Sequence, residues 1–361
     1  MKILFIYLFI TISWVSASDL RISSLGGNAG FWPEDDQNIM MFPSTINNFN
    51  LAQIQDASGE KPYATLIFGD DTKYGFMLDG NGDNLINVAY GIGNLGVLIG
   101  FDMNSSNSWQ YIYGNENIQE RNPFSMALNA MIGLDHSLGE IGLGINFSSS
   151  DNDNGINNDD LGLFNIGANF RREQSLWVFS HLLASANFGS GKMEEIITSD
   201  ENDPDPWSDT IAIDFSTLSL ETNLFRHWEI ASETDLMFAA GLGFAFNGFG
   251  PDSVKITETS IIIPNYILAV ETNVREWATL RAGINNAHIL SQSMKMEGSN
   301  QDLNSMGASE TNYSVGLGLE YEGFKLDLDL NPGFFINPVN YITGNNLMDP
   351  LATKATITYS F

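Results

Sequence analysis

Apolar and polar residues alternate along the last part of the chain, and the same alternation recurs upstream. In residues 355–361 every second side chain is apolar and ends on Phe361, while Thr and Ser occupy the positions between. A period of two predicts β-strands with one apolar and one polar face. The clearest further examples are Tyr74/Phe76/Leu78, Leu95/Val97/Ile99/Phe101, Phe124/Met126/Leu128, Ile141/Leu143/Ile145/Phe147, Leu236/Phe238/Ala240, Tyr313/Val315/Leu317 and Phe324/Leu326/Leu328.

The last predicted strand has an apolar face and a free edge, which in water would template aggregation. Pairing with the first strand removes that edge and closes a barrel with its apolar face toward lipid. We therefore predict an all-β fold, a transmembrane antiparallel up-and-down β-barrel of about 14–16 strands. The alternative is a β-sandwich, which has the same period but is less consistent with aromatic residues at so many strand ends.

Connection lengths orient the predicted barrel, because short turns face the periplasm and long loops face outward. We expect short turns at Gly91–Asn94, His136–Glu140, Arg171–Ser175, Phe225–Trp228, Asn273–Trp277 and Tyr321–Gly323. Long loops are expected at Asn104–Asn122, Ser149–Asp160, Gly189–Asp209, Asn247–Lys255, Ser291–Thr311 and Asn331–Leu351. A first, upward strand at Ile46–Gln55 brings the count to about 16, an even number.

Three regions follow from this pattern. Met1–Ala17 has a basic start, a short apolar run and a small-residue end, which predicts a secretory signal peptide. Residues 18–45 precede the alternation and form the predicted N-terminal luminal plug, and 46–361 form the barrel. Within the plug, Pro33 and the acids after it favour a short helix that ends at Pro43. The alternative is a periplasmic tail under the rim.

The plug segment resembles the start of FadL-like fatty-acid transporters and the related PorV-like barrels. Ser24-Leu25-Gly26-Gly27 resembles their small-residue segment, and Asp35, Asp36, Asn38, Ile39, Pro43, Ser44 and Ile46 fall where their second motif places such residues. Phe42 departs from that motif, which has Asn there. The resemblance implies a plug, 14 strands and a path for a small hydrophobic ligand; its PorV-like branch implies a docking platform.

Charged residues within the alternating segments identify the inner face, because charge facing lipid is costly. We predict as plug latch Asp35, Asp36, Asn38 and Pro43, and as lumen lining Glu233, Asp235, Glu271, Arg281, Glu320, Lys325, Asp327 and Asp329. Asp102, Asp135 and Arg171 also point inward by parity. Mutual structural pairing is the simpler role for these charges. Inward glycines at 142, 144, 241, 243, 316 and 318 leave room for a plug backbone or permit strand curvature.

The net charge of −29 and the absence of cysteine narrow the partners. Nucleic acid is excluded as a partner, because phosphate binding requires Lys and Arg. An acidic exterior favours cations and calcium-bridged lipopolysaccharide, so we expect outer-membrane lipid and lipopolysaccharide as partners. The terminal aromatic Phe361 is the expected contact for the barrel-assembly machinery.

Catalytic and cofactor motifs are absent from the sequence, so we expect no enzyme activity, no cofactor and no metal site. His181 or His288 in a barrel-wall hydrolase would need a serine and an acid, and the sequence offers no convincing partner. Residues 79–84 imitate half of a calcium loop but lack its glycine and its final acid, so a hairpin is the better interpretation.

The leading functional hypothesis is gated passage of a small substrate through a bacterial outer-membrane barrel. In one version of this hypothesis the substrate is hydrophobic. Two alternatives remain open. One is a barrel that does not transport and acts as a docking or surface scaffold, and the other is a cation-selective porin, favoured by the acidic lumen and loops.

Overall fold

The computed structural model describes most of the chain. It covers residues 20–55, 62–79, 85–105, 108–111, 118–121, 124–153, 157–198, 208–251, 254–296, 302–333 and 351–361. The signal peptide predicted at 1–17 and most of the calcium-like hairpin lie outside these residues.

Within these residues the elements are four short helices followed by strands. The helices are α1 (Leu20–Ser24), η1 (Ala29–Phe31), η2 (Asp36–Met40) and η3 (Pro43–Asn48). The strands are β1 (Leu51–Gln55), β2 (Tyr63–Phe68), β3 (Thr72–Asp79), β4 (Ile86–Ile92), β5 (Leu95–Ser105), β6 (Ser108–Tyr111), β7 (Ile118–Arg121), β8 (Phe124–His136), β9 (Gly139–Asp153), β10 (Asn157–Leu176), β11 (Phe179–Thr198), β12 (Ser208–Ala231), β13 (Thr234–Gly250), β14 (Ile256–Arg275), β15 (Ala278–Met296), β16 (Asp302–Ser305), β17 (Ala308–Tyr321), β18 (Phe324–Leu330) and β19 (Ala352–Ser360).

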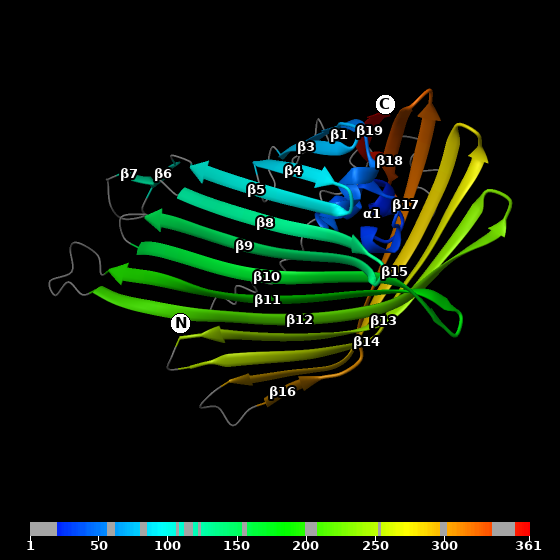
Figure 1. Ribbon diagram of the computed structural model, residues 1–361. Coiled ribbons are helices and arrows are strands. Elements are labelled where there is room, and N and C mark those ends of the chain that lie inside the picture. The colour runs from blue at the N-terminus through cyan, green and yellow to red at the C-terminus, as the bar shows by residue number, and fades with distance from the viewer. Residues whose placement is uncertain are drawn as a thin grey trace.

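Sixteen antiparallel strands of the described chain close into a ring, which confirms the predicted barrel (Figure 1). Closure occurs between the first and last strands, with Leu51 opposite Ser360 and Gln55 opposite Thr356. β16 and β17 pair with successive stretches of β15 and act as one interrupted strand. β6 and β7 form a separate hairpin within the predicted loop at 104–122.

The two faces of the wall differ as the alternation predicts. On β3, Tyr74, Phe76 and Leu78 are exposed on the outside, whereas Lys73 and Met77 are buried on the inside. Residues directly opposite each other in antiparallel strands share a face, so this assignment extends around the ring. The outer apolar face, which has no protein against it, matches the lipid-facing band of an outer-membrane barrel.

The wall is much taller on one side, which corrects several predicted loops. β9–β15 have 15 to 24 residues, whereas β1–β4 have 5 to 8 (Figure 1). The loops predicted at 149–160, 189–209 and 291–311 are mostly strand, and the one predicted at 247–255 is strand as far as Gly250. They lack strong alternation because they extend past the lipid, where a polar outer residue carries no penalty.

One outer row shows where the lipid-facing band ends. In register it runs Phe101, Leu128, Phe147, Phe164, Ser190, Ser216, Gly248, Thr257 and Lys295. Because barrel strands tilt, a row perpendicular to them climbs the wall. The row changes from apolar to polar as it climbs, so the upper parts of β11–β15 stand above the membrane.

Two predicted turns and the predicted start of the first strand are wrong. Arg171–Ser175 lies within β10 and Phe225–Trp228 within β12, and the turns follow at 177–178 and 232–233. The inner side chains of these stretches, including Arg171 and Phe225, pack against the N-terminal segment, which keeps the strands extended. β1 begins at Leu51, because Ile46 belongs to η3.

The N-terminal segment from Leu20 to Asn48 lies inside the ring near the end that carries the short turns (Figure 1). We call this segment the plug and that end the turn end. Asn28 and Asp35 cap η1 and η2 through their side chains, and Pro43 opens η3 rather than only ending a helix. No helix within the described residues is long and apolar enough to cross a bilayer.

Candidate functional site: the plug and the lumen

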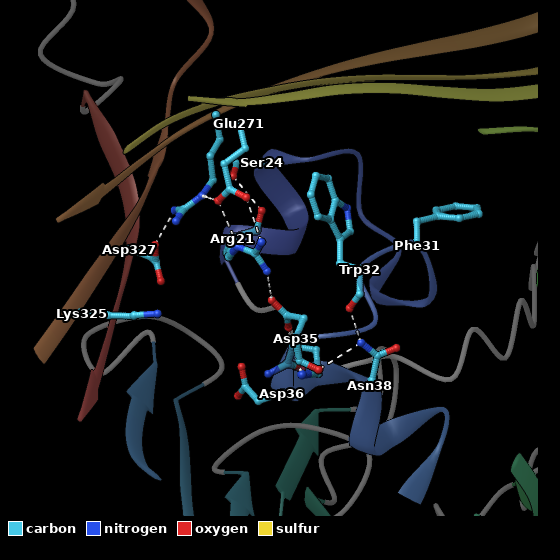
Figure 2. Close-up of polar contacts among 12 residues, drawn as sticks. Arg21, Ser24, Phe31, Trp32, Asp35, Asp36, Asn38, Glu271, Lys325 and Asp327 are labelled. Carbon is cyan, nitrogen blue, oxygen red and sulfur yellow. Dashed lines mark hydrogen bonds and ion pairs between the residues drawn. The ribbon is translucent and has the colours of Figure 1, made fainter. Parts of the chain in front are cut away.

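Arg21 is the charged centre of the plug (Figure 2). Its guanidinium donates to both carboxylate oxygens of Glu271 on β14, at 3.1 and 2.9 Å, and to Asp35 of the plug. Glu271 also accepts from Arg281 on β15 at 2.7 Å, and Arg281 pairs with Asp327 on β18. The chain of ion pairs ties three wall strands to the plug.

Asp35 and Asp36 have different roles. Asp35 accepts from the backbone N–H of Gln37 at 3.0 Å and pairs with Arg21. Asp36 has no such cationic partner in the described contacts; its carboxylate accepts a 3.4 Å hydrogen bond from Gln53 on β1. Burial, followed by the charge of Asp35, raises the pKa of Asp36 to about 7. This carboxyl group therefore titrates near neutral pH.

Arg171 holds the other side of the plug. It is buried, donates to Asn38 Oδ1 at 2.8 Å and to the Gly30 carbonyl at 3.0 Å, and pairs with Glu140 on β9. Its guanidinium also lies 4.6 Å from the centre of the Phe42 ring. Asn38 in turn donates to the Asp35 carbonyl, so the two arginine clusters are linked through η2.

Inner glycines let the plug backbone lie against the wall. In register these are Gly91, Gly96, Gly133 and Gly142. A Cβ at Gly142 would lie 1.9 Å from the Met41 carbonyl oxygen, and one at Gly96 2.0 Å from that of Pro43. We call these four residues the glycine bed. Of the predicted inward glycines, Gly316 also meets the plug at Ser24, whereas Gly318 meets Arg281 and Gly241 meets Asn223.

The predicted lumen-lining charges surround the same region. A cavity of about 270 Å³ at the turn end is lined by Arg21, Glu233, Asp235, Glu271, Arg281, Glu320, Lys325 and Asp327, among others. Lys325 and Glu320 face each other loosely at 3.7 Å. Asp329 lies one inner row farther along β18, opposite Lys354. Among the latch residues, Pro43 contributes through its backbone on the glycine bed.

Sequence reasoning left Arg21, Gln53 and His227 out of the site. His227, predicted in a turn, lies on β12 with Nε2 2.7 Å from the Phe31 carbonyl oxygen. Arg21 could have been found from the sequence, because it is the only basic residue of the plug, which also contains several acidic residues. Gln53 and His227 carried no such signal, since their contacts depend on how the plug lies against distant strands.

No group of metal-ligating side chains occurs among the described residues. Residues 200–205, an acidic stretch of the sequence within the predicted loop at 189–209, lie outside them.

Comparisons with known proteins concern barrel architecture alone. No family model matches the chain, and no curated protein matches it in sequence. Among solved structures, the chain is similar to the CymD monoaromatic hydrocarbon channel, with 10% identity, 94% of this chain and 97% of that chain covered, and a TM-score of 0.41. It is also similar to the translocator domain of the autotransporter NalP from Neisseria meningitidis, with 11% identity, 74% and 89% covered, and a TM-score of 0.33.

A third similar structure is the ferric-catecholate import receptor Fiu from E. coli K12, with 10% identity and a TM-score of 0.37. The match covers 78% of this chain and 54% of the receptor, so this chain spans about half the receptor's length. Closed strand pairing, an outer apolar belt and an inner polar face are all properties of the chain itself. The chain is a plugged β-barrel of the bacterial outer membrane.

Proposed function

We propose that the barrel provides gated passage for a small solute, with the plug as its gate. The observation that carries the proposal is how the plug is held. It docks through ion pairs and hydrogen bonds at Arg21 and Arg171, and it shares no β-ladder with the wall. Such contacts can separate while every strand of the ring remains paired.

Charged contacts suit a gate because water can replace them. An apolar plug core alone would resist release, since exposing it is unfavourable. Here apolar plug residues such as Phe31 and Ile39 do pack against the wall. The ion pair between Arg21 and Glu271 adds a component that depends on charge, and Asp36, with its pKa near 7, adds one that depends on pH. Gating by local conditions follows from that combination.

We infer further that the plug is of the FadL-like or PorV-like type. Leu25-Gly26-Gly27 and Asp35-Asp36 support this, because Gly26 packs on β14 and β15 and Asp35 caps η2. Fatty-acid-like cargo, which that resemblance implies, is one candidate class. The inner face offers amides and hydroxyls at many positions, which suits a solute with hydroxyl groups as another class.

The test uses the absence of cysteine in the chain. Ser314 Oγ donates to the Ser24 carbonyl at 3.0 Å, so Ser24→Cys with Ser314→Cys puts two thiols on adjoining segments of plug and wall, and a gel shift on oxidation checks that they join. Arg21→Gln serves as the released background. Planar-bilayer conductance is measured for the background alone, with the oxidised cysteine pair, and after reduction.

If the plug is a gate, the intact protein should have low conductance and Arg21→Gln higher conductance. Oxidation of the cysteine pair in the Arg21→Gln background should abolish the increase, and reduction should restore it. A scaffold predicts no conductance in any of these states. A constitutive cation-selective porin predicts salt-conducting steps from the intact and the crosslinked protein alike.

A further inference from the structure

A single inner row of the wall is rich in side-chain amides. In register it runs Lys325, Thr358, Gln53, Thr65, Met77, Asn87, Gly100, Asn129, Asn146, Asn165, Gly189, Thr217, Asn247 and Glu258. We call it the amide row. Between its charged ends it carries hydrogen-bonding side chains at most positions and no charge, in a chain of net charge −29.

The amide row traverses the barrel from one end to the other. Lys325 is the second residue of β18 and lies at the turn end, whereas Glu258 lies near the opposite end of β14. Because the strands tilt, the row climbs the inner wall as a spiral. At its lower end it reaches the gate, since Gln53 donates to Asp36 of the plug. The row therefore connects the outer opening with the gate.

Several amides of the row are buried, and one polar atom of each lacks a hydrogen-bond partner among the described residues. Asn87 Oδ1, Asn129 Oδ1 and Asn165 Nδ2 make no hydrogen bond among the described residues, and each of these side chains is at least nine-tenths buried. An unmade hydrogen bond at a buried amide is unfavourable, whichever way the amide is turned. These atoms have almost no exposed surface while the plug is docked, so a solute with hydroxyl groups would bond to them once the side chains around them turn aside.

The neighbouring inner row favours a solute that also has apolar faces. One step toward the outer opening, Leu163, Phe215 and Phe249 occupy the inner positions beside Asn165, Thr217 and Asn247. A sugar ring has C–H faces that pack on such side chains and hydroxyl edges that bond to amides. Ions lack the apolar faces, and alkyl chains lack the hydroxyl edges.

We propose that the amide row is the permeation track for small uncharged saccharides. This rests on the proposed gated passage and names its substrate class. The track selects by hydrogen bonds made one after another, so each amide should contribute to the rate of saccharide flux and little to ion flow.

The experiment measures hexose flux and potassium conductance in vesicles that contain the Arg21→Gln background. Asn129→Leu with Asn165→Leu removes two amides of the row. We expect hexose flux to fall about tenfold, as loss of two weak hydrogen bonds predicts, with potassium conductance changed less than about twofold. Asn129→Ser with Asn165→Ser, which keeps hydrogen-bonding groups, should retain most of the hexose flux.

Asn312→Leu is the matched control, because Asn312 shares the inner parity of β17 but lies off the row. It should leave hexose flux unchanged. An equal loss of hexose flux and potassium conductance would show that the pore has narrowed. Unchanged hexose flux would show that the row does not guide the saccharide. Either result would overturn the proposal of a permeation track. If the leucine pair fails to fold, Asn129→Ala with Asn165→Ala replaces it. Absence of all conductance in the background would contradict the gate itself.

Discussion

At the scale of single residues, two arginines carry the docking of the plug. Arg21 belongs to the plug and reaches the wall, and Arg171 belongs to the wall and reaches the plug. Each is enclosed with a carboxylate, and removing one partner of such a pair leaves an uncompensated charge.

Removing the charge of Glu271 should release the plug. In Glu271→Gln, Arg21 and Arg281 lose their shared carboxylate, and we expect docking to weaken by about 3 kcal/mol. The readout is open probability in planar bilayers, together with protease cleavage of the plug. Glu320→Gln is the control, because its pair with Lys325 is long and exposed and should contribute less than about 1 kcal/mol.

Asp36 should make the gate sensitive to pH. Its pKa in the docked plug is raised to about 7, so the docked state holds the proton more tightly than the released state. Docking is therefore strongest below the ordinary pKa of an aspartate and weakens as pH rises through about 7. Opening should increase severalfold from pH 5 to pH 8. Asp35, Arg21 and Asp327 also face this group.

Asp36→Asn is the decisive variant for that pH dependence. It should keep the plug docked at pH 8 and flatten the profile of open probability between pH 5 and pH 8. A profile with the same slope in the variant would assign the titration to another group.

The residues that sequence reasoning could find were those with a local signal. Asp35 followed a proline in an acidic run, and Glu271 broke the polar pattern of a strand with a charge. Gln53 looks like an ordinary strand residue and His227 like part of a turn, and only the plug lying across β1 and β12 gives them these partners.

At the scale of elements, the plug backbone fits against the wall because the glycine bed has no side chains there. Four neighbouring strands place a glycine at the same inner level, and η3 lies across them. The sequence showed inward glycines such as Gly142 without showing that they line up, because register between strands depends on the whole ring.

A methyl group on the glycine bed should lift the plug without harming the wall. In Gly142→Ala the Cβ would meet the Met41 carbonyl oxygen at 1.9 Å, so the plug backbone between η2 and η3 must move. We expect higher open probability and an unchanged β-sheet signal in circular dichroism. Gly162→Ala on β10 has nothing within 4 Å and should behave as the parent protein; a shared effect would contradict the steric explanation.

At the scale of the whole molecule, the outer surface records the position of the membrane. Alternation predicted the lower strands well, because there lipid requires an apolar outer face. It failed above the lipid, where Ser190 and Ser216 occupy outer positions and the pattern no longer distinguishes strand from loop.

The outer row supplies a matched pair of substitutions. Leu128→Arg places a charge within the apolar belt and should destabilise the folded barrel by about 2 to 4 kcal/mol, whereas Ser216→Arg on the same row should cost about 0 to 1 kcal/mol. Denaturant unfolding in vesicles measures both. Equal costs would mean that the row does not cross the membrane boundary.

The uneven height of the wall determines how molecules arrive. β12 has 24 residues, which at about 3.3 Å each and a tilt near 45° rise roughly 55 Å, against a belt of about 25 Å. The short strands β1–β4 end far lower. The rim of the barrel is therefore high along β9–β15 and low along β1–β4, so the opening is tilted toward the short strands. We therefore expect molecules to reach the lumen mainly from the side of the short strands.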